Sequence, residues 1–289
     1  MSCLRTARRR RGVCIVLACV LLLGALASVF LFPGRWYLFF QRHRWYPALQ
    51  WEKQPTDASG EAVSLETLLQ DERVTLTNTM LLVNETHPLP ADYQPMLTVY
   101  REIEMHPQSV KDYTALAERI LRLTGENLLV RDDYRTEEEQ RELIATSPEG
   151  IAAALGCSEH EAGLALDVCV KGYGGASFLK TWAGVMTNLL CAEYGYVIRY
   201  PLGKEDVTGI EYEPWHLRYV GAPHAKRMMQ SGLTLEEYLD ALTLGVWYRT
   251  EEYMICRTSP KGIRLPQGWQ SCEISPDNCG YYVITLRMS

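Results

Sequence analysis

The sequence predicts an α+β protein with a large buried core, and two observations support this fold class. Its 289 residues are 47% apolar and 22% charged, which is too apolar for a disordered chain and too charged for a polytopic membrane protein. Helix-like and strand-like segments also follow one another without a repeating order, as is typical of α+β domains. The length allows one large domain or two small ones.

Charge is distributed unevenly along the chain. The whole sequence carries a net charge of −6, yet residues 1–11 contain five arginines and no acidic residue. Residues 12–289 therefore carry −11, which is five charges below the total. A body this acidic argues against binding to a phosphate backbone, so we expect no nucleic-acid partner.

Residues 1–33 predict a basic cytoplasmic tail followed by a transmembrane anchor. The arginines at residues 8–11 precede an uncharged apolar run over residues 13–32. At about 1.5 Å per residue, a helix of about 20 residues crosses a hydrocarbon core of about 30 Å. The positive-inside rule keeps the arginines in the cytoplasm and places the chain after residue 33 outside the membrane.

A cleaved signal peptide is the alternative to this anchor, because Ala25-Leu26-Ala27 has the small-x-small pattern of a cleavage site. The apolar run continues through residues 29–32, which favours an uncleaved anchor. Residues 34–75 are then predicted to form a juxtamembrane stalk, with residues 55–60 as a flexible linker. The stalk opens with the residue types of a membrane–water interface: Arg35, Trp36, Tyr37, Phe39, Phe40, Arg42, Arg44, Trp45 and Tyr46.

Residues 76–232 carry the signals of the main domain. Helix starts are marked by capping residues, helix ends by glycine, and strands by short apolar runs. The predicted elements are a strand over residues 80–84, a helix over 110–123 that ends at Gly125, a helix that begins at Thr136 with Glu139 in a capping box, a long apolar helix over 177–194 and a strand over 196–200.

Residues 233–289 are predicted to form a C-terminal extension. Thr234 and Glu237 form a capping-box pattern that begins a helix running through Leu242. Alternating residue types over 281–286 then predict a small β appendage.

Six cysteines follow the predicted anchor, and an even number outside a membrane permits disulfides. Cys256, Cys272 and Cys279 lie close together in the sequence, which favours one pair among them. Cys169 and Cys191 lie in apolar stretches and are expected to be buried thiols. The pairing of Cys157 is left open. The sequence contains no CxxC, which argues against a structural zinc ribbon.

Two short segments hold residues suited to a catalytic metal. A catalytic zinc site uses three nitrogen or oxygen ligands and leaves one position open for water. His160, Asp167 and His216 would supply this set, and Gly163 permits the turn that lets the chain fold back between the first two. Glu213 lies three residues before His216, so it could face the attacking water as a general base in metal-assisted hydrolysis. Each of these residue types alone is common in structural roles, and the prediction rests on their combination.

These two segments, SEHEAGLALDV and TGIEYEPWHLRYVG, resemble the VanY-type D-alanyl-D-alanine carboxypeptidases. The resemblance extends over residues 77–232 and includes LLVNETHPLPADY, DDYRTEEEQ and AEYGYVIRYP. It implies the zinc D-Ala-D-Ala carboxypeptidase fold, which is hedgehog/DD-peptidase-like, with Zn²⁺ as the cofactor. In that family SxHxxGxAxD contributes two zinc ligands, and ExxH contributes the general base and the third ligand. Those roles fall on His160, Asp167, Glu213 and His216.

The family's Tyr-Arg…Gln element matches Tyr134, Arg135 and Gln140. The resemblance implies that Arg135 binds the terminal carboxylate of the substrate, helped by Gln140 and Ser158. A planar guanidinium suits this task because it donates two parallel hydrogen bonds. One departure is visible, since residues 132–133 are both aspartate where the family commonly has a Ser-Gly-type lead. The change adds negative charge beside the carboxylate-binding arginine.

The resemblance implies a zinc-dependent D,D-carboxypeptidase, anchored in the cell membrane of a bacterial envelope, that removes the C-terminal D-alanine from peptidoglycan stem peptides or precursors. Tyr212 and Trp215 are expected to line the cleft, and Arg218 to orient a carboxylate next to the metal. An L,D-carboxypeptidase that acts on tetrapeptide stems is one alternative, because the same arginine serves both reactions. A peptidoglycan-binding module without activity is another, although the intact Glu213 argues against it. No role is assigned to the C-terminal extension.

Overall fold

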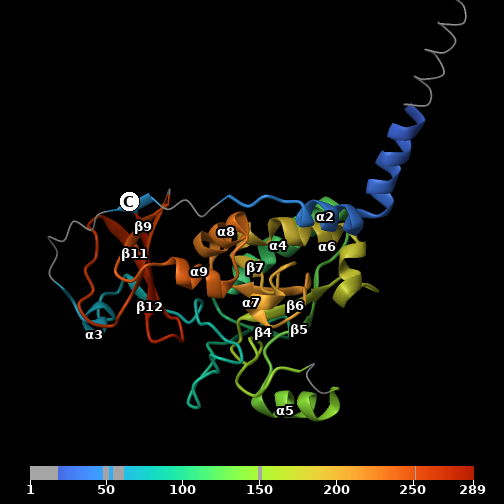
Figure 1. Cartoon of the computed structure of the whole chain (residues 1–289). Coiled ribbons are helices and arrows are strands. Elements are labelled where there is room, and N and C mark those ends of the chain that lie inside the picture. Colours follow the sequence, from blue (N-terminus) through green and yellow to red (C-terminus); the bar gives the residue numbers. More distant parts are fainter. Residues whose placement is uncertain (1–18, 48–51, 55–61, 149–151, 251) are drawn as a thin grey trace, which may run out of the picture.

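The computed structural model describes residues 19–47, 52–54, 62–148, 152–250 and 252–289. Within them the chain forms two large β-sheets that lie at opposite sides of the view in Figure 1. Two helices, α8 (Ala222–Ser231) and α9 (Leu235–Ala241), lie between the sheets. The predicted mixture of helices and strands is therefore confirmed.

The first sheet has four antiparallel strands in the order β5 (Leu129–Asp132), β6 (Ala165–Cys169), β8 (His216–Tyr219) and β7 (Tyr196–Ile198). Its buried residues form one core with α4 (Ser109–Thr124) and α6 (Trp182–Leu190). Both ends of α4 lie within two residues of the predicted helix, and α4 ends at Gly125 with a φ of 76°. A short hairpin and two further helices complete this part: β3 (Thr98–Tyr100), β4 (Ile103–Met105), α5 (Glu137–Thr146) and α7 (Glu205–Thr208).

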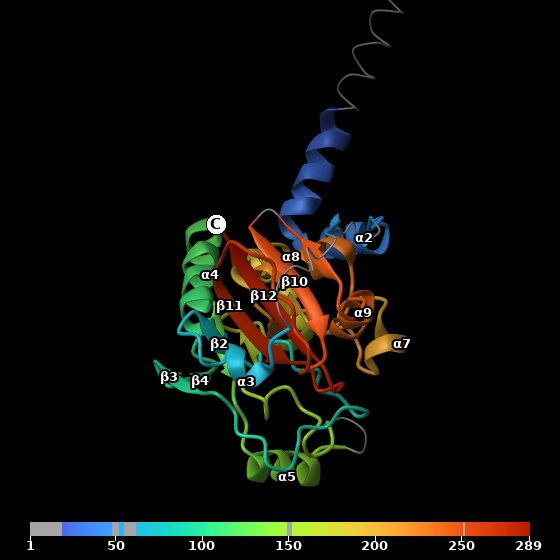
Figure 2. The ribbon, with the colours of Figure 1, turned by 90° about the vertical axis from the view of Figure 1, so that its left-hand side faces the viewer.

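The second sheet has six strands, and Figure 2 shows it face-on. All neighbours are antiparallel except β11 and β2, which are parallel. Its inner face packs on α8 and α9, so the two sheets share a continuous interior. The strand order is β1 (Glu52–Gln54), β9 (Trp247–Arg249), β10 (Tyr253–Thr258), β12 (Tyr282–Met288), β11 (Trp269–Pro276) and β2 (Val74–Leu76).

The second sheet differs from the predicted C-terminal appendage in its origin. The edge strand β1 and the first two residues of the edge strand β2 come from residues 34–75, which the sequence predicts as a stalk. This segment also contains α2 (Pro33–Arg42) and α3 (Leu65–Leu68). A strand of three residues is too short to show the alternation of apolar and polar residues that predicts strands. Such strands are recognised only by their pairing with distant strands. The predicted linker over residues 55–60 lies outside the described residues.

The helix predicted over residues 177–194 is divided into three pieces. A 3₁₀ turn, η1 (Gly175–Lys180), precedes α6, and a second one, η2 (Cys191–Tyr194), follows it. Thr181 is extended and its side chain accepts a hydrogen bond from Gly184 N, so a new helix begins there. The capping residue therefore overrides the continuous apolar pattern.

The segment predicted as a strand over residues 80–84 is buried through residue 83, but it forms no regular ladder. Its backbone bonds instead reach the second sheet, because Leu82 N donates to Asp277 O at 3.1 Å and Met80 N donates to Ser275 Oγ at 2.9 Å. The segment therefore ties the two sheets together.

The N-terminal part consists of the helix Cys19–Leu31 and α2, which meet at an angle of 95°. Among the described residues, neither helix alone has the length and apolar composition to cross a bilayer, whereas the bent pair taken together does. The predicted basic tail over residues 1–11 lies outside the described residues.

The cysteines that the structure describes are all free thiols, so the pair expected near the C-terminus is not formed. Cys256 lies on β10 and Cys272 on β11, and β12 separates the two strands. Two strand spacings amount to about 10 Å, which exceeds the reach of a disulfide.

Candidate metal centre

The three predicted ligands come together at one end of the four-stranded sheet. Asp167 on β6 pairs directly with His216, the first residue of β8. His160 lies on the loop before β6, where Gly163 adopts a φ of 70° and lets the chain reverse. One donor atom from each of the three side chains lies within 4.8 Å of the others. Strand register therefore joins residues that are far apart in the sequence.

Hydrogen bonds orient the two imidazole rings. Nδ1 of His160 lies 2.6 Å from the carbonyl oxygen of Asp133, which leaves Nε2 directed at Asp167 Oδ1, 3.5 Å away. His216 presents the other nitrogen, because its Nδ1 lies 2.9 Å from the same carboxylate oxygen. A metal ion would replace these contacts with bonds to Nε2 of His160, Nδ1 of His216 and the Asp167 carboxylate.

The buried Glu159 lies next to the Nε2 side of the His216 ring. Glu159 Oε2 lies 3.7 Å from His216 Nε2, and neither atom has a hydrogen-bond partner among the described residues. The other oxygen of Glu159 accepts from Arg199 Nε at 2.6 Å and from Arg218 Nη1 at 2.5 Å. Arg199 in turn pairs with Glu236 of α9. Glu159 is therefore placed to hold the ring of His216 in its ligand orientation.

Arg218, which was expected to orient a carboxylate next to the metal, forms an ion pair with Glu159. Glu159 itself was not among the predicted site residues, although it directly precedes His160. Adjacency to a predicted ligand was the one available signal. The ion pair between Glu236 and Arg199 could not be predicted from the sequence, because it depends on the packing of α9.

The charges around the cluster of His160, Asp167 and His216 favour the binding of a cation. Burial alone would lower the pKa of His216, but Asp167 and Glu159 outweigh it and raise this pKa to about 10. Burial would raise the pKa of Asp167, yet its contacts with His160 and His216 keep it well below the ordinary value. Two imidazoles and a carboxylate that stabilise positive charge form a donor set that fits Zn²⁺.

Glu213 lies beside this cluster. Its Oε2 atom is 3.8 Å from His216 Nδ1, because a turn closed by the bond from His216 N to Glu213 O joins the two residues. Burial raises the pKa of Glu213, and the nearby His216 opposes this only in part. A carboxylate with a raised pKa is suited to accept and return a proton.

Arg135 is held next to the cluster. Its backbone N donates to His160 O at 3.2 Å. Its guanidinium donates to Gln140 Oε1 at 2.7 Å and forms an ion pair with Asp132. Gln140 is fully buried and is fixed by its own bond to Ala153 O. The aspartate that departs from the family pattern therefore contacts the arginine directly.

The remaining predicted residues differ in their surroundings. Ser158 is buried, and its Oγ accepts from His160 N at 3.3 Å, so it supports the ligand loop. Tyr134 lies between Asp133 and Arg135, and its backbone N donates to Glu104 O. Trp215 and Tyr212 are half-buried and pack against the main core.

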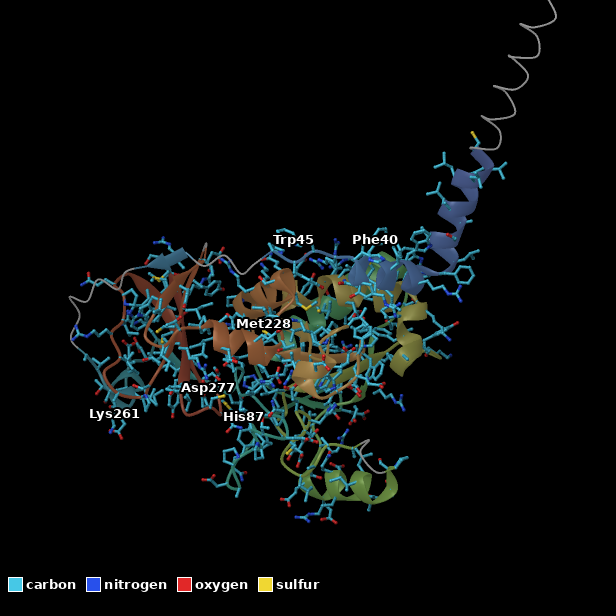
Figure 3. The ribbon with its side chains drawn as sticks, viewed as in Figure 1. Phe40, Trp45, His87, Met228, Lys261 and Asp277 are labelled. Atoms are coloured by element: carbon cyan, nitrogen blue, oxygen red, sulfur yellow. The ribbon has the colours of Figure 1, made fainter. Side chains whose placement is uncertain are left out.

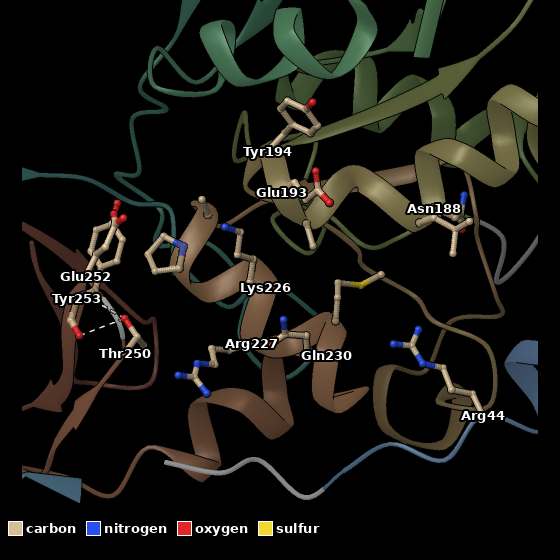
Figure 4. Close-up of a pocket in the computed structure, with 15 residues that line it drawn as sticks. Arg44, Asn188, Glu193, Tyr194, Lys226, Arg227, Gln230, Thr250, Glu252 and Tyr253 are labelled. Carbon is tan, nitrogen blue, oxygen red and sulfur yellow. Dashed lines mark hydrogen bonds between the residues drawn. The ribbon is translucent and has the colours of Figure 1, made fainter. Parts of the chain in front are cut away.

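A separate hollow of about 1000 Å³ lies between α8, η2 and the segment that follows α2 (Figure 4). Charged side chains of both signs line it, including Arg44, Lys226, Glu193 and Glu252. None of the predicted site residues lines this hollow. The predicted site residues and this hollow are thus distinct features.

The fold and the cluster are those of a metallohydrolase. The family model described as VanY, D-alanyl-D-alanine carboxypeptidase, matches residues 102–222. A bifunctional D-Ala-D-Ala dipeptidase and D-Ala-D-Ala carboxypeptidase, VanXYC of Enterococcus gallinarum, is 37% identical over 185 residues, which are 57% of this chain and 95% of the relative. The chain therefore belongs to the VanY family of D-alanyl-D-alanine carboxypeptidases.

Two solved structures are similar to this chain. The vancomycin resistance D,D-dipeptidase VanXYg, in complex with a D-Ala-D-Ala phosphinate analogue, has a TM-score of 0.61 and 26% identity, with 73% of this chain and 94% of that one covered. The LD-carboxypeptidase LdcB has a TM-score of 0.52 and 31% identity, with 56% of this chain and 86% of that one covered.

Proposed function

We propose that the protein is a zinc-dependent D,D-carboxypeptidase that removes the C-terminal D-alanine from peptidoglycan stem peptides or precursors. The observation that carries this proposal is the joint placement of the candidate metal cluster, the half-buried Glu213 and Arg135. Family membership supports it. Zinc, when bound, would polarise the scissile carbonyl and acidify a water molecule.

The chain's own residues divide the remaining work. His160, Asp167 and His216 would hold the metal. Glu213 would take a proton from the attacking water and pass it to the leaving amine. Arg135 would bind the terminal carboxylate, with its guanidinium oriented by Gln140.

Three further residues belong to the substrate side in this proposal. Ser158 supports the loop of His160 through its hydroxyl. Tyr134 precedes the arginine and Trp215 precedes His216, so both lie next to residues with a direct role. We assign them to the walls that position the peptide.

Chelation tests the metal and the activity together. Removal of zinc should abolish release of D-alanine, and added zinc should restore it. His216→Ala should lose both zinc and turnover, because one of three ligands is missing. A purified His216→Ala protein with stoichiometric zinc would show that the ligand assignment is wrong.

The L,D-specificity of LdcB makes the tetrapeptide reaction the second candidate. Pentapeptide and tetrapeptide stems, with products identified by mass, separate the two activities. Loss of D-alanine from the pentapeptide alone supports D,D-specificity. Absence of turnover on both substrates by a zinc-loaded enzyme would favour a binding module.

We also propose that residues 13–32 anchor the protein in the cell membrane with residues 34–289 outside. The helix Cys19–Leu31 leaves the body and points away from it, which suits an anchor (Figure 1). In this organisation residues 76–232 form the catalytic domain and residues 233–289 an extension. Protease added to intact protoplasts should remove the body, and a protected body would contradict this topology.

A further inference from the structure

The helix α2 has one face fitted to the catalytic body. Pro33, Gly34 and Tyr37 are buried there, and Tyr37 packs with Leu179 and Val185. A Cβ atom on Gly34 would lie 2.1 Å from the carbonyl oxygen of Leu179, so only glycine permits this approach. The helix therefore moves with the body as one unit.

The part of α2 that does not pack on the body is aromatic and exposed, and Phe40 and Trp45 lie at the upper edge of the molecule in Figure 3. Phe39 and Phe40 keep 51% and 63% of their surface exposed, and Trp45 just beyond the helix keeps 82%. The rings of Trp36, Phe39 and Phe40 contact one another, with centroids 5.6 to 6.2 Å apart. Clustered exposed aromatic side chains are typical of a contact surface.

The charged side chains of α2 and of the segment just after it are all basic. Arg35, Arg42 and Arg44 are exposed, and the sequence contains no aspartate or glutamate before Glu52. Aromatic rings mixed with arginines are typical of the bilayer interface, and anionic headgroups attract such arginines. The charge pattern therefore complements an anionic lipid surface.

The geometry at the start of α2 agrees with this partner. Trp36 Nε1 donates to Ser28 Oγ at 3.1 Å, and the ring of Phe30 packs on Trp182 of α6 at 6.1 Å. These contacts hold the 95° angle between the helix Cys19–Leu31 and α2. If the first helix follows the membrane normal, α2 lies in the plane of the membrane. An acidic protein partner would match the charges but would not account for this continuity.

We propose that the exposed face of α2 binds the surface of an anionic phospholipid bilayer and thereby orients the catalytic body. The proposal rests on the membrane anchor proposed above. The helix α5, which carries Gln140, lies at the end of the molecule opposite α2 in both views (Figure 1, Figure 2). The substrate-binding end therefore points away from the bilayer and toward the wall.

Photo-crosslinking in the full-length protein tests the contact. Benzoylphenylalanine replaces Phe40, Leu22 of the anchor, or Val99 on β3, in vesicles of phosphatidylcholine and phosphatidylglycerol. Val99 is the matched control for Phe40, because the two side chains are similarly exposed, at 66% and 63%. We expect lipid adducts from positions 40 and 22 and none from position 99.

The outcomes separate this proposal from the anchor. Adducts at position 22 without adducts at position 40 would overturn the α2 contact and leave the anchor intact. Absence of lipid adducts at both positions would overturn both. Crosslinks from position 40 to a protein in cell membranes, with no lipid adduct, would also overturn the lipid assignment.

Charge removal tests the lipid chemistry. The double variant carries Arg35→Gln and Arg42→Gln. Its labelling from position 40 in vesicles that contain phosphatidylglycerol should drop to the level that the unchanged arginines give in pure phosphatidylcholine. Labelling from position 22 and turnover of a soluble pentapeptide should not change. Wild-type labelling that is independent of phosphatidylglycerol would show that the anionic headgroups are not recognised.

Discussion

Arg135 is the residue whose proposed role is tested most directly by changing the enzyme and the substrate together. Arg135→Ala removes the guanidinium, and amidation of the substrate's C-terminus removes the carboxylate that the guanidinium would bind. Each change alone should lower kcat/KM. The second change should cost little once the first is made, because the pair is then already broken.

The expected size follows from the surroundings of the guanidinium. The Arg135 side chain is 14% exposed, so a carboxylate bound to it is largely shielded from water. A hydrogen bond to a charged group contributes about 1.5–3 kcal/mol, which corresponds to about 10- to 150-fold in kcat/KM. Asp132 and Gln140 already accept bonds from two of its nitrogens, so the substrate would use the remaining N–H groups.

Steady-state kinetics on a pentapeptide and its C-terminal amide, with both enzymes, measure the four rates. Arg141→Ala is the matched control, because Arg141 lies on the exposed side of α5 and pairs with Glu137 there. It should show the full wild-type penalty for amidation. If amidation penalises wild type and Arg135→Ala equally, Arg135 does not bind the carboxylate and the reasoning is refuted.

Three further predictions concern the cluster and the fold. Glu213→Gln should retain zinc and lower kcat by about 10²–10⁴-fold, and a loss of zinc on dialysis would argue for a ligand role instead. Glu159→Gln should weaken zinc binding by about 10–100-fold through His216, as measured by competition with a chromogenic chelator; unchanged affinity in a folded variant would dismiss the orienting role. Burial lowers the pKa of His224 to about 3 from its ordinary value near 6.5. The unfolded chain therefore binds the extra proton first, and stability is lost as the pH falls below about 6.5, by about 2 kcal/mol at pH 5. Urea unfolding at pH 7 and pH 5 should show a smaller loss for His224→Gln, and equal losses would contradict this.

Much of the candidate site follows from short-range pattern. His160 and Asp167 are separated by a glycine turn and a strand, and Glu213 and His216 share a single turn. These spacings can be recognised in a sequence because each pair is local. The capping boxes at Thr136 and Thr234 form for the same reason, since each involves residues three positions apart.

What the sequence by itself determined is therefore local: the residue types of the cluster, the starts of capped helices and the apolar runs that become buried. The tertiary structure alone decided which distant residues meet. The register of β6 and β8 joins Asp167 to His216, and the packing of α9 brings Glu236 to Arg199. The edge strands β1 and β2 likewise exist only through pairing with the C-terminal strands. Such contacts depend on the summed packing of many side chains, and no single spacing in the chain encodes them.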